Sequence, residues 1–149
     1  MNSLFNPEHN KEIVERINKL TPQSKAQWGK MNVGQAMAHC QQPLRVAYGD
    51  LKLKRTFFGF LLGGMVKKKL TGPADYDKNL PTDKHFIVSD QRNFETEKLK
   101  LIALVQKFAS EGPKALTKEA HPFFGRLTTA EWDALQYKHL HHHLTQFGV

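Results

Sequence analysis

Four histidines stand close together near the end of the chain, at positions 139, 141, 142 and 143. In an α-helix each residue turns by about 100° relative to the one before it. On a helix through this segment, His139 and His143 fall on one face, His141 lies opposite them, and His142 lies on the flank. Two imidazoles four residues apart on one helical face can hold a divalent ion, because their side chains converge. We therefore interpret His139 and His143 as metal ligands.

A divalent ion requires at least one more ligand from another part of the chain. His39 is the best candidate, although it lies beside the centre of the apolar stripe of its predicted helix. Gln146 shares the face of His143, and we expect its amide to fill a place in the core or to support a ligand by a hydrogen bond. His121, just before the last helix, is a candidate supporting group or fourth ligand, with an ordinary loop histidine as the alternative.

A purification tag and a structural role are the two alternatives to a metal site for these histidines. A tag is an uninterrupted terminal run, whereas Leu140 breaks this one and the chain continues through Phe147 in phase with the apolar face. In the structural alternative, His139 and His143 are buried histidines held by hydrogen bonds. For His39 taken alone, the sequence favours a structural role and a role as a metal ligand equally.

The segments that carry these residues have the features of helices. Asn6-Pro7-Glu8 is typical of a helix start, and the helix that it opens ends before Pro22. A second helix is predicted from Asn32, with Pro43 indicating a kink or an early end. A third is predicted over about 92–110. The last begins at the capping box Thr128-Thr-Ala-Glu131 and continues to the end of the chain.

These helices predict an all-α fold, an up-down four-helix bundle formed by a single domain over 1–149. Residues 49–90 are predicted to form a long connection between the second and third helices, with a short helix at about 57–69. No segment shows the sustained alternation of a strand, so a sheet is not expected.

Composition excludes several classes of protein. The 149 residues carry a formal charge of +8, but the motifs and interleaved aromatic residues of nucleic-acid-binding modules are missing. The single cysteine cannot form an internal disulfide, the first residues do not form a signal peptide, and no apolar stretch is long enough to span a membrane. We therefore expect a cytoplasmic protein whose lysines attract small anions rather than nucleic acid.

Several motifs together resemble the DinB/YfiT-like putative metalloenzymes, and more narrowly an uncharacterised bacterial branch of that superfamily. The similarity covers most of the chain. It is carried by Trp28-Gly-Lys-Met31, His39, Lys78-Asn-Leu-Pro-Thr82, His121-Pro-Phe-Phe-Gly125, Glu131-Trp132 and Tyr137–Gly148.

The resemblance implies an up-down four-helix bundle, often a homodimer, in which His39, His139 and His143 hold a metal. Superfamily members with known activity include thiol-dependent transferases and a thiol-cofactor-linked isomerase. The family's usual Arg-Gly after the last ligand is replaced here by Leu144-Thr145, so any role of that arginine in substrate binding is not carried over.

Three neutral imidazoles leave an ion its full charge and an open position for water, thiolate or carboxylate. We expect the ion to be zinc, with nickel, iron or manganese as alternatives. The ion would activate a low-molecular-weight thiol or a water molecule. The activated group would be transferred to, or would hydrolyse, a small molecule that is anionic or linked to a thiol. One alternative is a bundle that binds a metal or small molecule without turnover. Another is a protein that uses Phe57–Lys69 at a membrane surface or on a partner.

Overall fold

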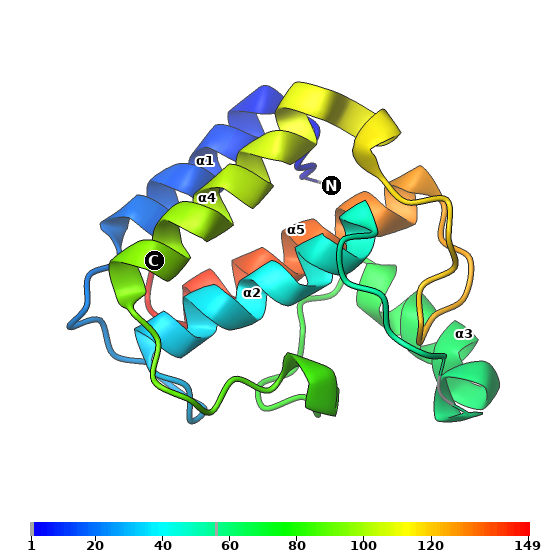
Figure 1. The fold of residues 1–149 in the computed structure, drawn as a ribbon, viewed down its shortest axis with the longest axis horizontal. Helices are drawn as coiled ribbons and strands as arrows, with labels where there is room; N and C mark the ends of the chain where they lie inside the picture. The colour runs from blue at the N-terminus through cyan, green and yellow to red at the C-terminus, as the bar shows by residue number, and fades with distance from the viewer. Residues whose placement is uncertain (1, 56) are drawn as a thin grey trace.

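The computed structural model describes residues 2–55 and 57–149, and its regular secondary structure is helical (Figure 1). No strand occurs among them, so the all-α prediction is confirmed. The helices are α1 (Pro7–Lys19), α2 (Val33–Tyr48), α3 (Phe57–Thr71), α4 (Phe94–Glu111) and α5 (Thr129–Gln146), with short 3-10 helices η1 (Lys84–Phe86) and η2 (Gly112–Ala115).

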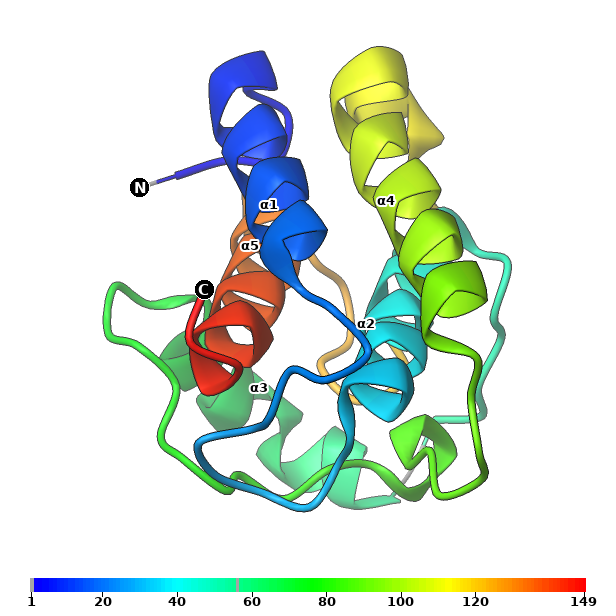
Figure 2. The same ribbon diagram turned by 90° about the vertical axis from the view of Figure 1, so that its left-hand side faces the viewer.

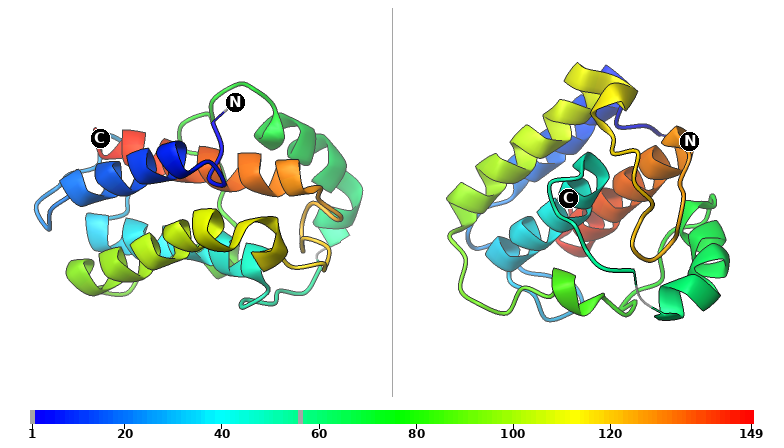
Figure 3. Two further views of the ribbon diagram at one scale, coloured as in Figure 1. Left: turned by 90° about the horizontal axis from the view of Figure 1, so that it is seen from above. Right: turned by 45° about the vertical axis from the view of Figure 1, so that its right-hand side comes forward.

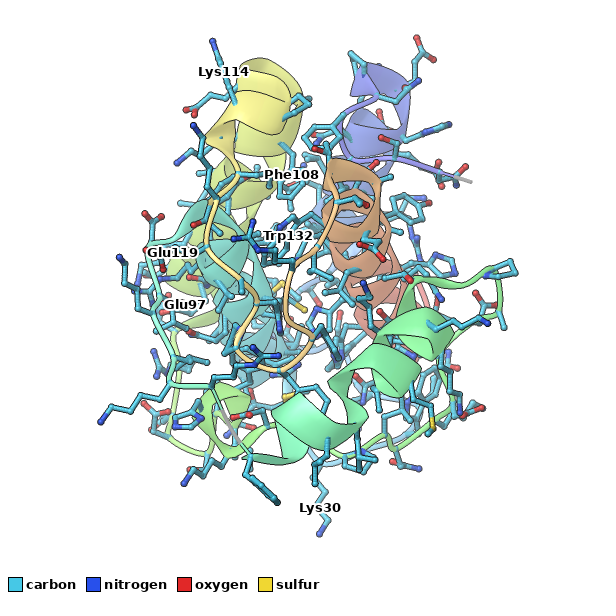
Figure 4. All side chains as sticks on the ribbon, turned by 90° about the vertical axis from the view of Figure 1, so that its right-hand side faces the viewer. Lys30, Glu97, Phe108, Lys114, Glu119 and Trp132 are labelled. Carbon is cyan, nitrogen blue, oxygen red and sulfur yellow. The ribbon has the colours of Figure 1, made fainter. Side chains whose placement is uncertain are left out.

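Four of the helices share one hydrophobic core. Both α4 and α5 contact α1 and α2, so each of the four packs against two neighbours (Figure 2). Phe108 and Trp132 are buried between the helices, whereas Lys30, Lys114 and Glu119 reach outward (Figure 4). The chain reverses direction between α1 and α2 and between α4 and α5, but α2 and α4 run the same way (Figures 1 and 3). The long connection between α2 and α4 returns the chain to the end at which α2 begins, so the four core helices do not alternate in direction as the predicted up-down bundle would.

The predicted helix starts are confirmed by their capping contacts. The Asn6 side chain accepts hydrogen bonds from the first turn of α1. Asn32 begins α2 in a capping box with Gln35, and Thr128 begins α5 in a capping box with Glu131. These bonds pair backbone N–H groups that the helix leaves free.

Of the kink or early end predicted at Pro43, the early end does not occur, because α2 continues to Tyr48. Proline removes one helical hydrogen bond, but α2 lies between α4 and α5 and buries most of its residues. Burial of this surface outweighs the missing bond.

The short helix expected at 57–69 is present as α3, and it extends to Thr71. It packs against α5. Gly63 lies so close to the Phe123 carbonyl oxygen that a Cβ would overlap it, and Lys67 forms a 2.9 Å ion pair with Glu131. None of the helices in the described ranges is both long and apolar enough to cross a membrane.

Candidate metal centre

Three histidines from two helices meet in the bundle. His39 comes from the middle of α2, and His139 and His143 come from the last two turns of α5. One ring nitrogen from each lies within 4.8 Å of the others. The Nε2 atoms of His39 and His139 are 3.1 Å apart, and the His143 ring centre is 4.7 Å from each of the other two. The arrangement could hold a metal ion.

The hydrogen bond of His39 fixes which of its nitrogens faces the centre. Its Nδ1 lies 2.8 Å from the Phe86 carbonyl oxygen, at the end of η1. A carbonyl oxygen only accepts, so Nδ1 carries the proton and Nε2 keeps its lone pair. In the metal-free protein the Nε2–H of His139 can donate to this lone pair, and a bound ion would replace that proton. The ring of His39 is thus oriented as a ligand.

Gln146 orients His143 in the same way. Its Nε2 donates to the Trp28 carbonyl oxygen at 2.7 Å, which turns its Oε1 toward His143 Nδ1 at 2.8 Å. His143 therefore donates from Nδ1 and leaves Nε2 free. Gly29 allows this contact, because its φ is +82° and a Cβ there would lie 2.5 Å from Gln146 Nε2. The backbone next to Trp28 therefore needs a glycine to lie this close to Gln146 of α5.

Burial keeps all three imidazoles neutral. Burial is the largest of the effects on the pKa of His39, and it lowers that pKa. The pKa of His139 is far below the ordinary value, first through burial and then through its histidine neighbours. Burial and the nearby His39 lower the pKa of His143 to about 3. Neutral imidazole is the form that binds metals, so the rings need not lose a proton to the solvent at neutral pH.

The donor set fits a divalent transition metal. Tetrahedral zinc with Zn–N bonds of about 2.0–2.1 Å places its nitrogen ligands about 3.3 Å apart, which is close to the His39–His139 separation. Among the described residues, the group of adjacent ligand atoms contains imidazoles and no carboxylate or thiolate. The ion would therefore keep its double positive charge and at least one open position.

His121 is engaged in the loop before α5. Its Nδ1 accepts hydrogen bonds from the backbone N–H groups of Phe123 and Phe124, at 3.1 and 3.2 Å. Its ring stacks on Phe124 and contacts Trp132. Neutral His121 therefore carries its proton on Nε2, which leaves no free lone pair for a metal. The structure does not bring His121 into the three-histidine group, and its contacts are those of a residue that shapes the loop.

The other two histidines of α5 face different surroundings. His141 Nδ1 lies 2.8 Å from the Arg16 guanidinium, on the side of α5 that faces α1. His142 contacts the rings of Trp28 and Tyr76, each with a centroid separation of 5.8 Å, and lies beside His143. The helical angles separated these two from the ligand pair, but no signal in the sequence indicated that Trp28 and Tyr76 meet at His142.

Comparison with known proteins gives one family. The family described as "Protein of unknown function (DUF1569)" matches residues 5–148, which is almost the whole chain. Neither the curated proteins nor the solved structures contain a match. The match includes all three histidines of the candidate metal centre, and the chain belongs to the DUF1569 family.

Proposed function

We propose that this protein is a metal-dependent enzyme that activates a thiol or a water molecule for transfer to, or hydrolysis of, a small molecule. The observation that carries this proposal is the convergence of three neutral imidazoles. Two of them are held by Nδ1 hydrogen bonds that free Nε2 for an ion. A divalent ion bound by these residues would lower the pKa of a thiol or water in its open position.

We also propose that this chain belongs to the DinB/YfiT-like superfamily. One candidate ligand lies on the second of the four core helices and two lie on the last, as that resemblance implies. The homodimer is part of the same proposal, as is zinc rather than nickel, iron or manganese.

The test of the enzymatic proposal is thiol-dependent turnover that requires metal. Untagged protein loaded with one equivalent of zinc is expected to consume a low-molecular-weight thiol in the presence of chlorodinitrobenzene, or to hydrolyse an activated ester. Chelation should stop the reaction and added zinc should restore it. A protein that binds zinc tightly but turns over neither substrate would be a metal-binding bundle without catalysis, contrary to this proposal.

The exposed face of α3 favours a second candidate function, docking on an anionic membrane surface. Phe57, Leu61 and Met65 follow one another at intervals of four residues and are 72%, 59% and 75% exposed. Six basic residues and no acidic residue lie between positions 51 and 74. Apolar side chains flanked by lysines bind anionic lipid surfaces, whereas two copies of this face would repel each other.

We expect the protein to float with vesicles that contain phosphatidylglycerol, and not with pure phosphatidylcholine vesicles. Met65→Glu should reduce the bound fraction several-fold, because it places a charge in the lipid-facing stripe. Leu99→Glu changes an apolar residue of α4 that is 68% exposed, and it should have no effect. A Met65→Glu variant that binds as before, or that only converts a dimer to a monomer in light scattering, would contradict membrane docking.

A further inference from the structure

In the described part of the chain, three buried side-chain donor atoms have no hydrogen-bond partner. They are the indole Nε1 of Trp28, the hydroxyl of Tyr76 and the amide Nε2 of Gln136. Buried polar groups are nearly always paired, so each exception calls for a physical cause, such as a water molecule or a ligand. These three come from different parts of the chain: the connection before α2, the segment between α3 and η1, and α5.

Two of these donors lie beside the candidate metal centre. The rings of Trp28 and Tyr76 contact His142, whose ring is 5.2 Å from that of His143. Gln136 lies one turn before His139 on α5, about 120° around the helix axis from His142, so it is not part of this pair.

Two lysines accompany the donors. Lys138 donates to the Gly72 carbonyl oxygen at 2.7 Å and holds its ammonium 4.8 Å from the centre of the Tyr76 ring, which ties the segment of Tyr76 to α5. Lys78 places its ammonium 4.6 Å from the centre of the Trp28 ring. One acidic neighbour, Asp75, acts on Lys138. The surroundings therefore favour an anionic ligand that offers acceptor atoms.

We infer that Trp28 and Tyr76 form the subsite for a carboxylate of the substrate, whose other end reaches the metal. A carboxylate has two oxygens that each accept hydrogen bonds, which matches one indole N–H and one phenol O–H. This inference rests on the proposed metal-dependent function. It narrows the substrate to a small carboxylic acid that also carries a thiol or another group able to bind the ion.

The test measures thiol binding to cobalt-loaded protein by the absorption band between thiolate and cobalt. The probes are mercaptocarboxylates of increasing length, from mercaptoacetate to mercaptobutanoate, each paired with the mercaptoalcohol of the same length. At the best length the acid is expected to bind about tenfold or more tightly than the alcohol, since hydrogen bonds to a charged acceptor are the strong ones. Trp28→Phe and Tyr76→Phe should each remove most of this preference. Tyr137→Phe, which removes a hydroxyl that pairs with Asn2 instead, should leave it unchanged.

A melting curve of the free protein separates a ligand-binding role from a structural one. The Tyr76 hydroxyl has no hydrogen-bond partner here, so Tyr76→Phe should leave the melting temperature unchanged or raise it. A lowered melting temperature would mean that this hydroxyl holds the fold together, against the inference. Equal binding of acid and alcohol in cobalt-loaded protein would overturn the subsite alone, since a water molecule then suffices for the donors. Failure to take up cobalt would overturn the proposed function together with the subsite.

Discussion

His139→Ala and His143→Ala are each expected to reduce bound metal from close to one ion per chain to background. Structural zinc sites of four protein ligands release about 10–16 kcal/mol on binding, so one ligand accounts for about 3–4 kcal/mol. Its loss weakens binding by several hundredfold or more. Elemental analysis of untagged protein, followed by competition with a chelator of known affinity, measures the change.

His141→Ala is the matched control, because it removes a neighbouring histidine of the same helix. His141 pairs with Arg16 and does not belong to the three-histidine group, so this variant should keep its metal. Circular dichroism should show that all three variants remain helical. Retention of metal by His139→Ala, or its loss in His141→Ala, would contradict the assignment of the ligands.

Gln146→Met is expected to weaken metal binding by about 10–100-fold, although Gln146 does not contact the ion. Methionine has nearly the same size but neither accepts from His143 Nδ1 nor donates to the Trp28 carbonyl oxygen. Without that acceptor, His143 can move its proton to Nε2 and lose the lone pair that faces the centre. Isothermal titration of metal-free protein with zinc measures the loss.

Gln136→Met is the control for this change, because it makes the same replacement on the same helix. The hydrogen bonds of the ligand histidines go to Phe86, Gln146 and one another, so zinc affinity should stay within about twofold of the original protein.

Gly29→Ala tests the contact between Gln146 and His143 from the opposite side, since the added Cβ would displace the Gln146 amide. Unchanged zinc affinity in both Gln146→Met and Gly29→Ala would show that this hydrogen bond does not orient His143.

Local signals allowed much of the helical framework to be predicted. The caps at Asn6, Asn32 and Thr128 depend on side chains within three residues of each helix start, so they can be recognised without the tertiary structure. The turn of the α-helix likewise placed His139 and His143 together and His141 apart, because both residues of the pair belong to one element.

Long-range contacts could not be predicted in this way. Phe86, Trp28 and Tyr76 come from connections without periodicity, so their positions next to His39 and His142 depend on the path of the chain between helices. The early end predicted at Pro43 does not occur, because the packing of α2 against two other helices overcomes the local effect of the proline. Proximity in sequence to α5 made His121 a candidate for the centre, but its bonds are made within its own loop.

The most direct measurement is an anomalous-scattering map of crystals of untagged protein that has met no metal column. We expect one peak per chain, within bonding distance of the Nε2 atoms of His39, His139 and His143, with a further position open to solvent. A map without this peak in protein soaked in zinc, or a peak bound to other residues, would contradict the metal centre.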